Sequence, residues 1–155
     1  RAPLSKSRTG QLAMEARELP GSQSRLLAHL LLNNPTGTDD VGMRIDAGLL
    51  ALASAAGLRA RTAAAVDAIA AGLPSDRPLR GAMLHPTCGA LLARLLPALT
   101  ANGADLTVID GEPSVLAFVD AGLQARPAEV RLSMVRADLT GLIHVKCLVV
   151  TARGS

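Results

Sequence analysis

The residues with the clearest chemical potential follow the short apolar run Ala82–Leu84. They place an imidazole and a thiol three positions apart, at His85 and Cys88, directly before Gly89. A cysteine at the start of a helix should have a lowered pKa, so one interpretation is a thiolate nucleophile with His85 as its base. The other interpretation is a small buried cysteine beside a structural histidine.

Gly89 itself also has two interpretations. In the first turn of a helix, a glycine lets a ligand approach the backbone and leaves amide N–H groups available for a carboxylate or phosphate. A glycine at the same place can instead be required for packing the helix on a sheet. The two interpretations predict different surroundings for the same residue.

Two aspartates end the next two apolar runs. Asp110 ends the run Asp105–Asp110, and Asp138 follows the run Val130–Val135. A carboxylate at the end of a strand can accept hydrogen bonds from both hydroxyls of a ribose. Alternatively, Asp110 caps the next helix with the help of Gly111, and Asp138 is a solvated loop residue.

The elements that must position these residues alternate between strand and helix. Strands are predicted at 82–84, 105–110, 130–135 and 143–150, with helices after the first two, the first opened by Pro86. This order predicts an α/β fold in residues 80–152, a Rossmann-like parallel sheet with helices on its faces and right-handed crossovers. Ligands bind such sheets at the carboxyl ends of the strands, where the residues above would meet.

The part of the chain before this core has a different composition. Residues 1–23 are rich in Arg, Ser and Gly and are predicted to form a flexible basic arm. Residues 24–72 are predicted to form a helical region, with helices over Ser24–Leu32, Arg44–Ala56 and Thr62–Ala71 and with Gly57 ending the second of them. Their Ala/Leu-rich surfaces indicate a homo-oligomeric or partner interface. His29 is interpreted as a boundary residue of the first helix.

Composition excludes several classes of protein. The chain of 155 residues has one Phe and neither Trp nor Tyr, which disfavours nucleic-acid binding by base stacking. Cys88 and Cys147 lie far apart and belong to no metal-ligand pattern. No signal-peptide pattern or membrane-length apolar run is present, which predicts a reduced, cytoplasmic protein without a membrane partner. The first residue is Arg1 rather than Met, which predicts a trimmed chain or a fragment.

Taken together, the core resembles the class I S-adenosylmethionine-dependent methyltransferases. The turn His85-Pro86-Thr87-Cys88-Gly89-Ala90 is similar to the D-P-x-C-G-x-G turn of the amino-methyltransferases, with His in place of Asp and without the second glycine. Asp110 and Asp138 stand at the spacing of that family's acidic residues. The resemblance implies that S-adenosylmethionine is bound by His85, Cys88, Gly89, Asp110, Gly111 and Asp138.

Three functional classes therefore remain open. The first is an S-adenosylmethionine-binding methyltransferase or methyltransferase-like protein, in which proximity supplies most of the rate of methyl transfer. The second is a non-catalytic α/β assembly or partner-binding module. The third is a nucleotide or sugar-phosphate enzyme on a doubly wound sheet, since the fold alone does not choose among them.

Overall fold

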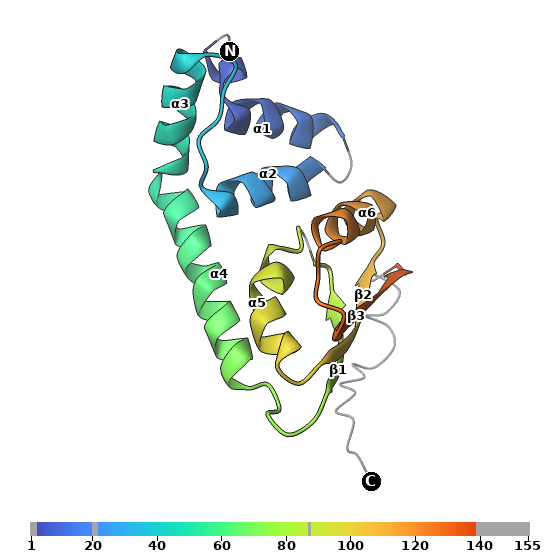
Figure 1. Ribbon diagram of the computed structural model, residues 1–155. Coiled ribbons are helices and arrows are strands. Elements are labelled where there is room, and N and C mark those ends of the chain that lie inside the picture. The colour runs from blue at the N-terminus through green and yellow to red at the C-terminus, as the bar shows by residue number, and fades with distance from the viewer. Residues whose placement is uncertain (1–2, 20–21, 87, 139–155) are drawn as a thin grey trace.

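The computed structural model describes residues 3–19, 22–86 and 88–138. A long helix, Ala53–Ala71, runs along one side of the molecule, with the other N-terminal helices beside its upper end and the sheet unit beside the rest of it (Figure 1). The elements are α1 (Arg8–Glu18), α2 (Ser22–Leu32), α3 (Asp40–Leu50), α4 (Ala53–Ala71), β1 (Leu79–Leu84), α5 (Ala90–Thr100), β2 (Ala104–Asp110), α6 (Pro113–Gly122) and β3 (Val130–Arg136), preceded by a 3-10 turn, Leu4–Lys6.

The predicted α/β class is confirmed by the sheet, which is parallel and has the order β1-β2-β3 in the described part of the chain. The β-branched and leucine-rich strands form one buried face, because side chains alternate along each strand. That face carries Leu106 and Val108 of β2 and packs against Leu92, Leu95 and Val119 from α5 and α6. The predicted strand at 143–150 lies outside the described residues.

The opposite face of the sheet is not covered by α5 or α6, in contrast to the prediction of helices on its faces. It presents the side chains of Leu84 from β1, Ile109 from β2 and Val135 from β3 in one row, and Leu84 and Val135 are exposed. Among the described residues, α5 and α6 both lie against the other face. Two right-handed crossovers that proceed in the same direction across a sheet place their helices on the same side, which accounts for this arrangement.

The prediction of a flexible arm over residues 1–23 is wrong for its described helical part. Ser7 caps α1, because its Oγ accepts a hydrogen bond from the Gly10 amide across 3.0 Å. Leu12 anchors the helix and is buried against the rest of the molecule. The composition of the segment concealed one capping residue and one core leucine, both of which stabilise this helix.

The predicted helix ends in the next region also need correction. Gly57 does not end a helix but lies inside α4, and the chain instead breaks between Leu50 and Ala53, where α3 and α4 meet at 60°. A glycine in a helix costs only about 1 kcal/mol relative to alanine, which the alanine-rich neighbours of Gly57 can offset. In the described part of the chain no single helix could span a membrane by length and composition; α3 and α4 pass that test only as this bent pair.

Candidate functional site

The candidate site lies at the carboxyl edge of the sheet. Because β1 and β2 are parallel and neighbouring, the residue that follows β1 lies beside the last residue of β2. These residues are His85 and Asp110, and the imidazole Nδ1 donates to Asp110 Oδ2 across 3.0 Å. The structure therefore brings together two of the residues that the sequence indicated.

Backbone contacts hold this pair in place. The His85 amide donates to the Ile109 carbonyl across 2.9 Å, which continues the strand ladder by one bond. At the same residue the backbone turns into the left-handed region, with φ of 51°. A non-glycine residue in this conformation is uncommon and is concentrated at turns and functional sites. The turn directs the imidazole outward, and 69% of the His85 side chain is exposed.

Asp110 is nearly buried beneath the imidazole, with an exposure of 3%. Its Oδ1 accepts a hydrogen bond from the Glu112 amide across 2.9 Å. The predicted capping role belongs to Glu112 rather than to Asp110, because Glu112 is the N-cap of α6 and accepts from the Ser114 amide. Asp110 is thus a buried acceptor that orients an exposed imidazole, an arrangement that can move a proton or hold a ligand hydroxyl.

A polar cavity of about 460 Å³ opens over this pair. One wall consists of His85, Asp110, Glu112 and the start of α6. The opposite wall comes from the N-terminal helices and consists of Ala16, Arg17, Glu18, Leu19, Gln23 and Ser24. Charges of both signs therefore face the same cavity. The sequence reasoning missed this second wall, since it treated the segment as an arm.

Cys88 and Gly89 lie in different surroundings and border a separate apolar cavity. Burial raises the pKa of the Cys88 thiol, and the smaller opposing effect of the Ala90 amide does not offset it. The predicted low-pKa thiolate is therefore wrong. The amides of Cys88 and Gly89 both donate to the Pro86 carbonyl, at 2.7 and 3.0 Å, so they are occupied within the turn.

Gly89 satisfies a packing requirement. It caps α5 in the left-handed conformation, with φ of 67°, and a Cβ at this position would come within 3.1 Å of Val119 on α6. This contact between two helices corresponds to the packing interpretation, although the neighbour is a helix rather than the sheet. The prediction that Pro86 opens the helix is also wrong, because α5 begins at Ala90.

Gly111 and Asp138 meet at the third strand end. A Cβ at Gly111 would lie 3.4 Å from the Ala137 carbonyl oxygen and 3.9 Å from the Asp138 Cα. The Ala137 amide also donates to the Asp110 carbonyl across 3.1 Å. Asp138 is exposed and borders the same edge of the sheet. The last two sequence-predicted residues are therefore neighbours of Asp110, and they flank the cavity rather than line it.

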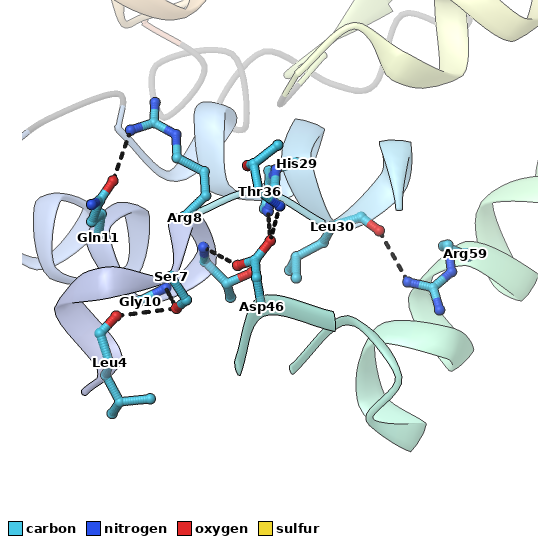
Figure 2. A network of polar contacts seen from close by, with 11 residues as sticks. Leu4, Ser7, Arg8, Gly10, Gln11, His29, Leu30, Thr36, Asp46 and Arg59 are labelled. Carbon is cyan, nitrogen blue, oxygen red and sulfur yellow. Dashed lines mark hydrogen bonds and ion pairs between the residues drawn. The ribbon is translucent and has the colours of Figure 1, made fainter. Parts of the chain in front are cut away.

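A second Asp–His pair lies in the helical region, where the sequence reasoning identified no site (Figure 2). Asp46 is fully buried and accepts from the Thr9 amide at 2.6 Å, the Thr36 amide at 3.0 Å and the His29 Nε2 at 2.9 Å. Burial pushes the pKa of Asp46 upward, but these hydrogen bonds outweigh it, and the net pKa is lowered. His29 is partly buried, which agrees with the interpretation as a boundary residue, and it is also the partner of a buried carboxylate.

Within residues 3–19, 22–86 and 88–138, no group of three or more His, Cys, Asp or Glu side chains could hold a metal ion. Comparisons of the chain with protein-family models, curated proteins and solved structures find no match.

Proposed function

We propose that the cavity over His85 and Asp110 binds S-adenosylmethionine and that the chain is a methyltransferase or methyltransferase-like protein with a Rossmann-like core. The observation that carries this proposal is the nearly buried Asp110 carboxylate at the end of β2, facing a polar cavity of about 460 Å³. Pockets for small molecules and cofactors begin at about 300 Å³, so the volume is sufficient for an adenosyl ligand.

The charges of the cavity support this choice. Each carboxylate oxygen has two acceptor positions, so Asp110 can accept from a ribose hydroxyl in addition to its bonds with His85 and Glu112. S-adenosylmethionine also carries a sulfonium cation, an ammonium group and a carboxylate. Glu18 and Glu112 can attract the cationic groups, and Arg17 can pair with the carboxylate. Once the ligand is bound, proximity to an acceptor would supply the rate of methyl transfer.

The test is isothermal titration of the chain with S-adenosylmethionine and, separately, S-adenosylhomocysteine. We expect micromolar binding that weakens at least about tenfold in Asp110→Asn, which is a loss of about 1.4 kcal/mol. Asp105→Asn is the matched control, since Asp105 lies on the same strand but is exposed at its other end. Absence of binding by either compound would contradict the proposal. Tighter binding of AMP or ribose 5-phosphate would favour a nucleotide or sugar-phosphate enzyme instead.

A second candidate function, assembly through the helical region, is favoured by one feature of α4. This helix of 19 residues is apolar around most of its circumference, yet Ala55 is its only buried residue among those described. A helix that is apolar on all sides is normally buried. The outward face therefore suits a partner, and the small residues on it would allow a second helix to approach closely.

The charges on this face suit a second copy of the chain. Arg61 and Asp67 each lie three residues from Ala64, and neither has a hydrogen bond or ion pair with another described residue. In an antiparallel pair with a two-fold axis at Ala64, Arg61 of one copy lies opposite Asp67 of the other. Such a pair would bury the outward face and match both charges.

Analytical ultracentrifugation tests this second candidate. We expect a dimer that dissociates in Arg61→Asp, because two like charges then face each other, and that forms again in the double variant Arg61→Asp with Asp67→Arg. A monomer at all concentrations, or a dimer that is insensitive to both changes, would exclude this pairing.

A further inference from the structure

The apolar cavity beside Cys88 is separate from the polar cavity over His85 and Asp110, and the S-adenosylmethionine proposal does not use it. It has a volume of about 290 Å³ and lies where α2, α5 and α6 meet. Its lining comes from both regions of the molecule, with Leu31 and Leu32 from α2, Ala93 and Arg94 from α5, and Phe118 from α6. The only aromatic residue of the chain thus borders this cavity.

The size of the cavity limits its occupant. A cavity of about 150 Å³ lined by apolar side chains can hold benzene. The present volume is about twice as large, which suits two fused rings or an alkyl chain of similar volume. Leu32 is 76% exposed at the rim, so a ligand seated there would also cover apolar surface that the protein leaves in water.

The charge of the cavity is positive. Among the described residues that line it, Arg94 is the single charged one, and none is Asp or Glu. The Arg94 guanidinium donates to the Leu31 carbonyl across 3.4 Å, a long bond that leaves most of its five N–H donors for another partner. An arginine at the edge of an apolar cavity can pair with a carboxylate through two parallel hydrogen bonds.

We propose that this cavity binds a small apolar carboxylic acid, with its ring system or alkyl chain against Phe118 and Leu31 and its carboxylate on Arg94. The neutral thiol of Cys88 adds a further apolar surface, because burial raises its pKa and keeps it protonated near neutral pH. This site is distinct from the polar cavity of His85 and Asp110, and its test does not depend on binding of the adenosyl ligand.

Titration with 2-naphthoic acid and, in parallel, with the uncharged 2-naphthol tests the proposal on the whole chain. We expect the acid to bind at least about tenfold more tightly than the alcohol. In Arg94→Gln the acid should lose this advantage, while the affinity for the alcohol should not change. Equal affinities of the two probes for the unaltered chain would overturn the assignment of a carboxylic acid.

A variant that fills the cavity separates this site from general surface binding. Gly122 borders the cavity, and a Cβ added there meets no atom within 4 Å, so Gly122→Leu has room for its side chain. We expect it to weaken binding of the acid at least about tenfold. Gly48→Leu is the matched control, because Gly48 also lies in a helix with open space and is not part of this lining. Unchanged binding in Gly122→Leu, or no binding of either probe to the unaltered chain, would overturn the proposal.

Discussion

The helical region and the sheet unit each contain a buried aspartate bonded to a histidine, but the two pairs differ in what surrounds the imidazole. The side chain of His29, which is bonded to Asp46, is 11% exposed, whereas that of His85, which is bonded to Asp110, is 69% exposed. Two motifs of the same composition thus have different access to solvent. A buried carboxylate therefore does not by itself indicate a functional site, and the exposure of its histidine partner is the more informative feature.

The two aspartates also differ in how far along the chain their hydrogen-bond partners lie. Asp46 accepts from two backbone amides, Thr9 and Thr36, that belong to different segments, and it therefore joins α1, α2, α3 and the loop before α3 (Figure 2). Asp110 accepts from one amide, that of Glu112, only two residues away. Asp46 therefore stabilises long-range structure, and Asp110 organises a local turn at the cavity.

The largest expected difference between the two pairs is in the stability lost when each aspartate is replaced. Asp46→Ala should lower the free energy of unfolding by about 3–5 kcal/mol, because it removes a buried partner and leaves two amides and an imidazole without their acceptor. Asp110→Ala should cost about 1–3 kcal/mol, since its histidine can bond to water. Urea denaturation of both variants measures the difference. Equal losses of stability in the two variants would contradict the distinction between a structural Asp46 and a local Asp110.

A smaller effect is expected on how stability changes with pH. Because the pKa of Asp46 is lowered in the folded state, its contribution to stability is complete above its unfolded pKa, about 3.9, and is lost as the pH falls through the folded value. We expect the unaltered chain to lose more stability between pH 6 and pH 3 than Asp46→Asn does. The urea midpoint across that range measures this. If Asp46→Asn loses as much stability as the unaltered chain over this pH range, Asp46 is not the group that titrates.

The two histidines should also differ in their contributions to stability. His29→Ala should cost about 2 kcal/mol, because a hydrogen bond to a buried carboxylate is lost. His85→Ala should cost less, about 1 kcal/mol, because water in the adjoining cavity can replace the exposed imidazole as a donor to Asp110. Thermal unfolding of both variants under identical conditions provides the measurement. A larger loss of stability in His85→Ala than in His29→Ala would assign a structural role to the pair of His85 and Asp110.

The smallest expected effect is on the reactivity of Cys88. Because burial raises the pKa of this thiol, it should react with iodoacetamide more slowly than an unstructured cysteine at pH 8, and the difference should disappear in urea. The rate is best measured by mass spectrometry in a Cys147→Ser variant, so that Cys88 is the single thiol. Reaction as fast in the folded chain as in urea would restore the thiolate interpretation.

Local patterns in the sequence predict the sheet better than the helices. The strands at 105–110 and 130–135 agree with β2 and β3 to within a residue at each end, because both runs contain β-branched residues and are closely bounded by turns. The break between α3 and α4 was missed because alanines on both sides fit a helix equally well. The helix end at Leu32 was found, since the turn cluster that follows it contains two Asn, a Pro and a Gly.

The candidate site was predictable only in part. His85 and Asp110 could be placed together, since the ends of parallel strands share one edge of the sheet. Arg17 and Glu18 could not, because their positions depend on how the N-terminal helices pack on the rest of the molecule, through long-range contacts such as that of Thr9 with Asp46. A local pattern contains no information on such contacts.

The central claim, that the exposed Asp–His pair faces a ligand while the buried pair is structural, is tested most directly by nitrogen-15 NMR of the histidine rings. The chain contains three histidines, and variants at His29 and His85 assign their signals. On addition of S-adenosylhomocysteine we expect the ring resonances of His85 to shift to saturation and those of His29 to remain in place, and we expect the His85 shift in Asp110→Asn to require at least about tenfold more ligand. Saturating ligand that leaves His85 unchanged, or that moves His29 equally, would contradict the account.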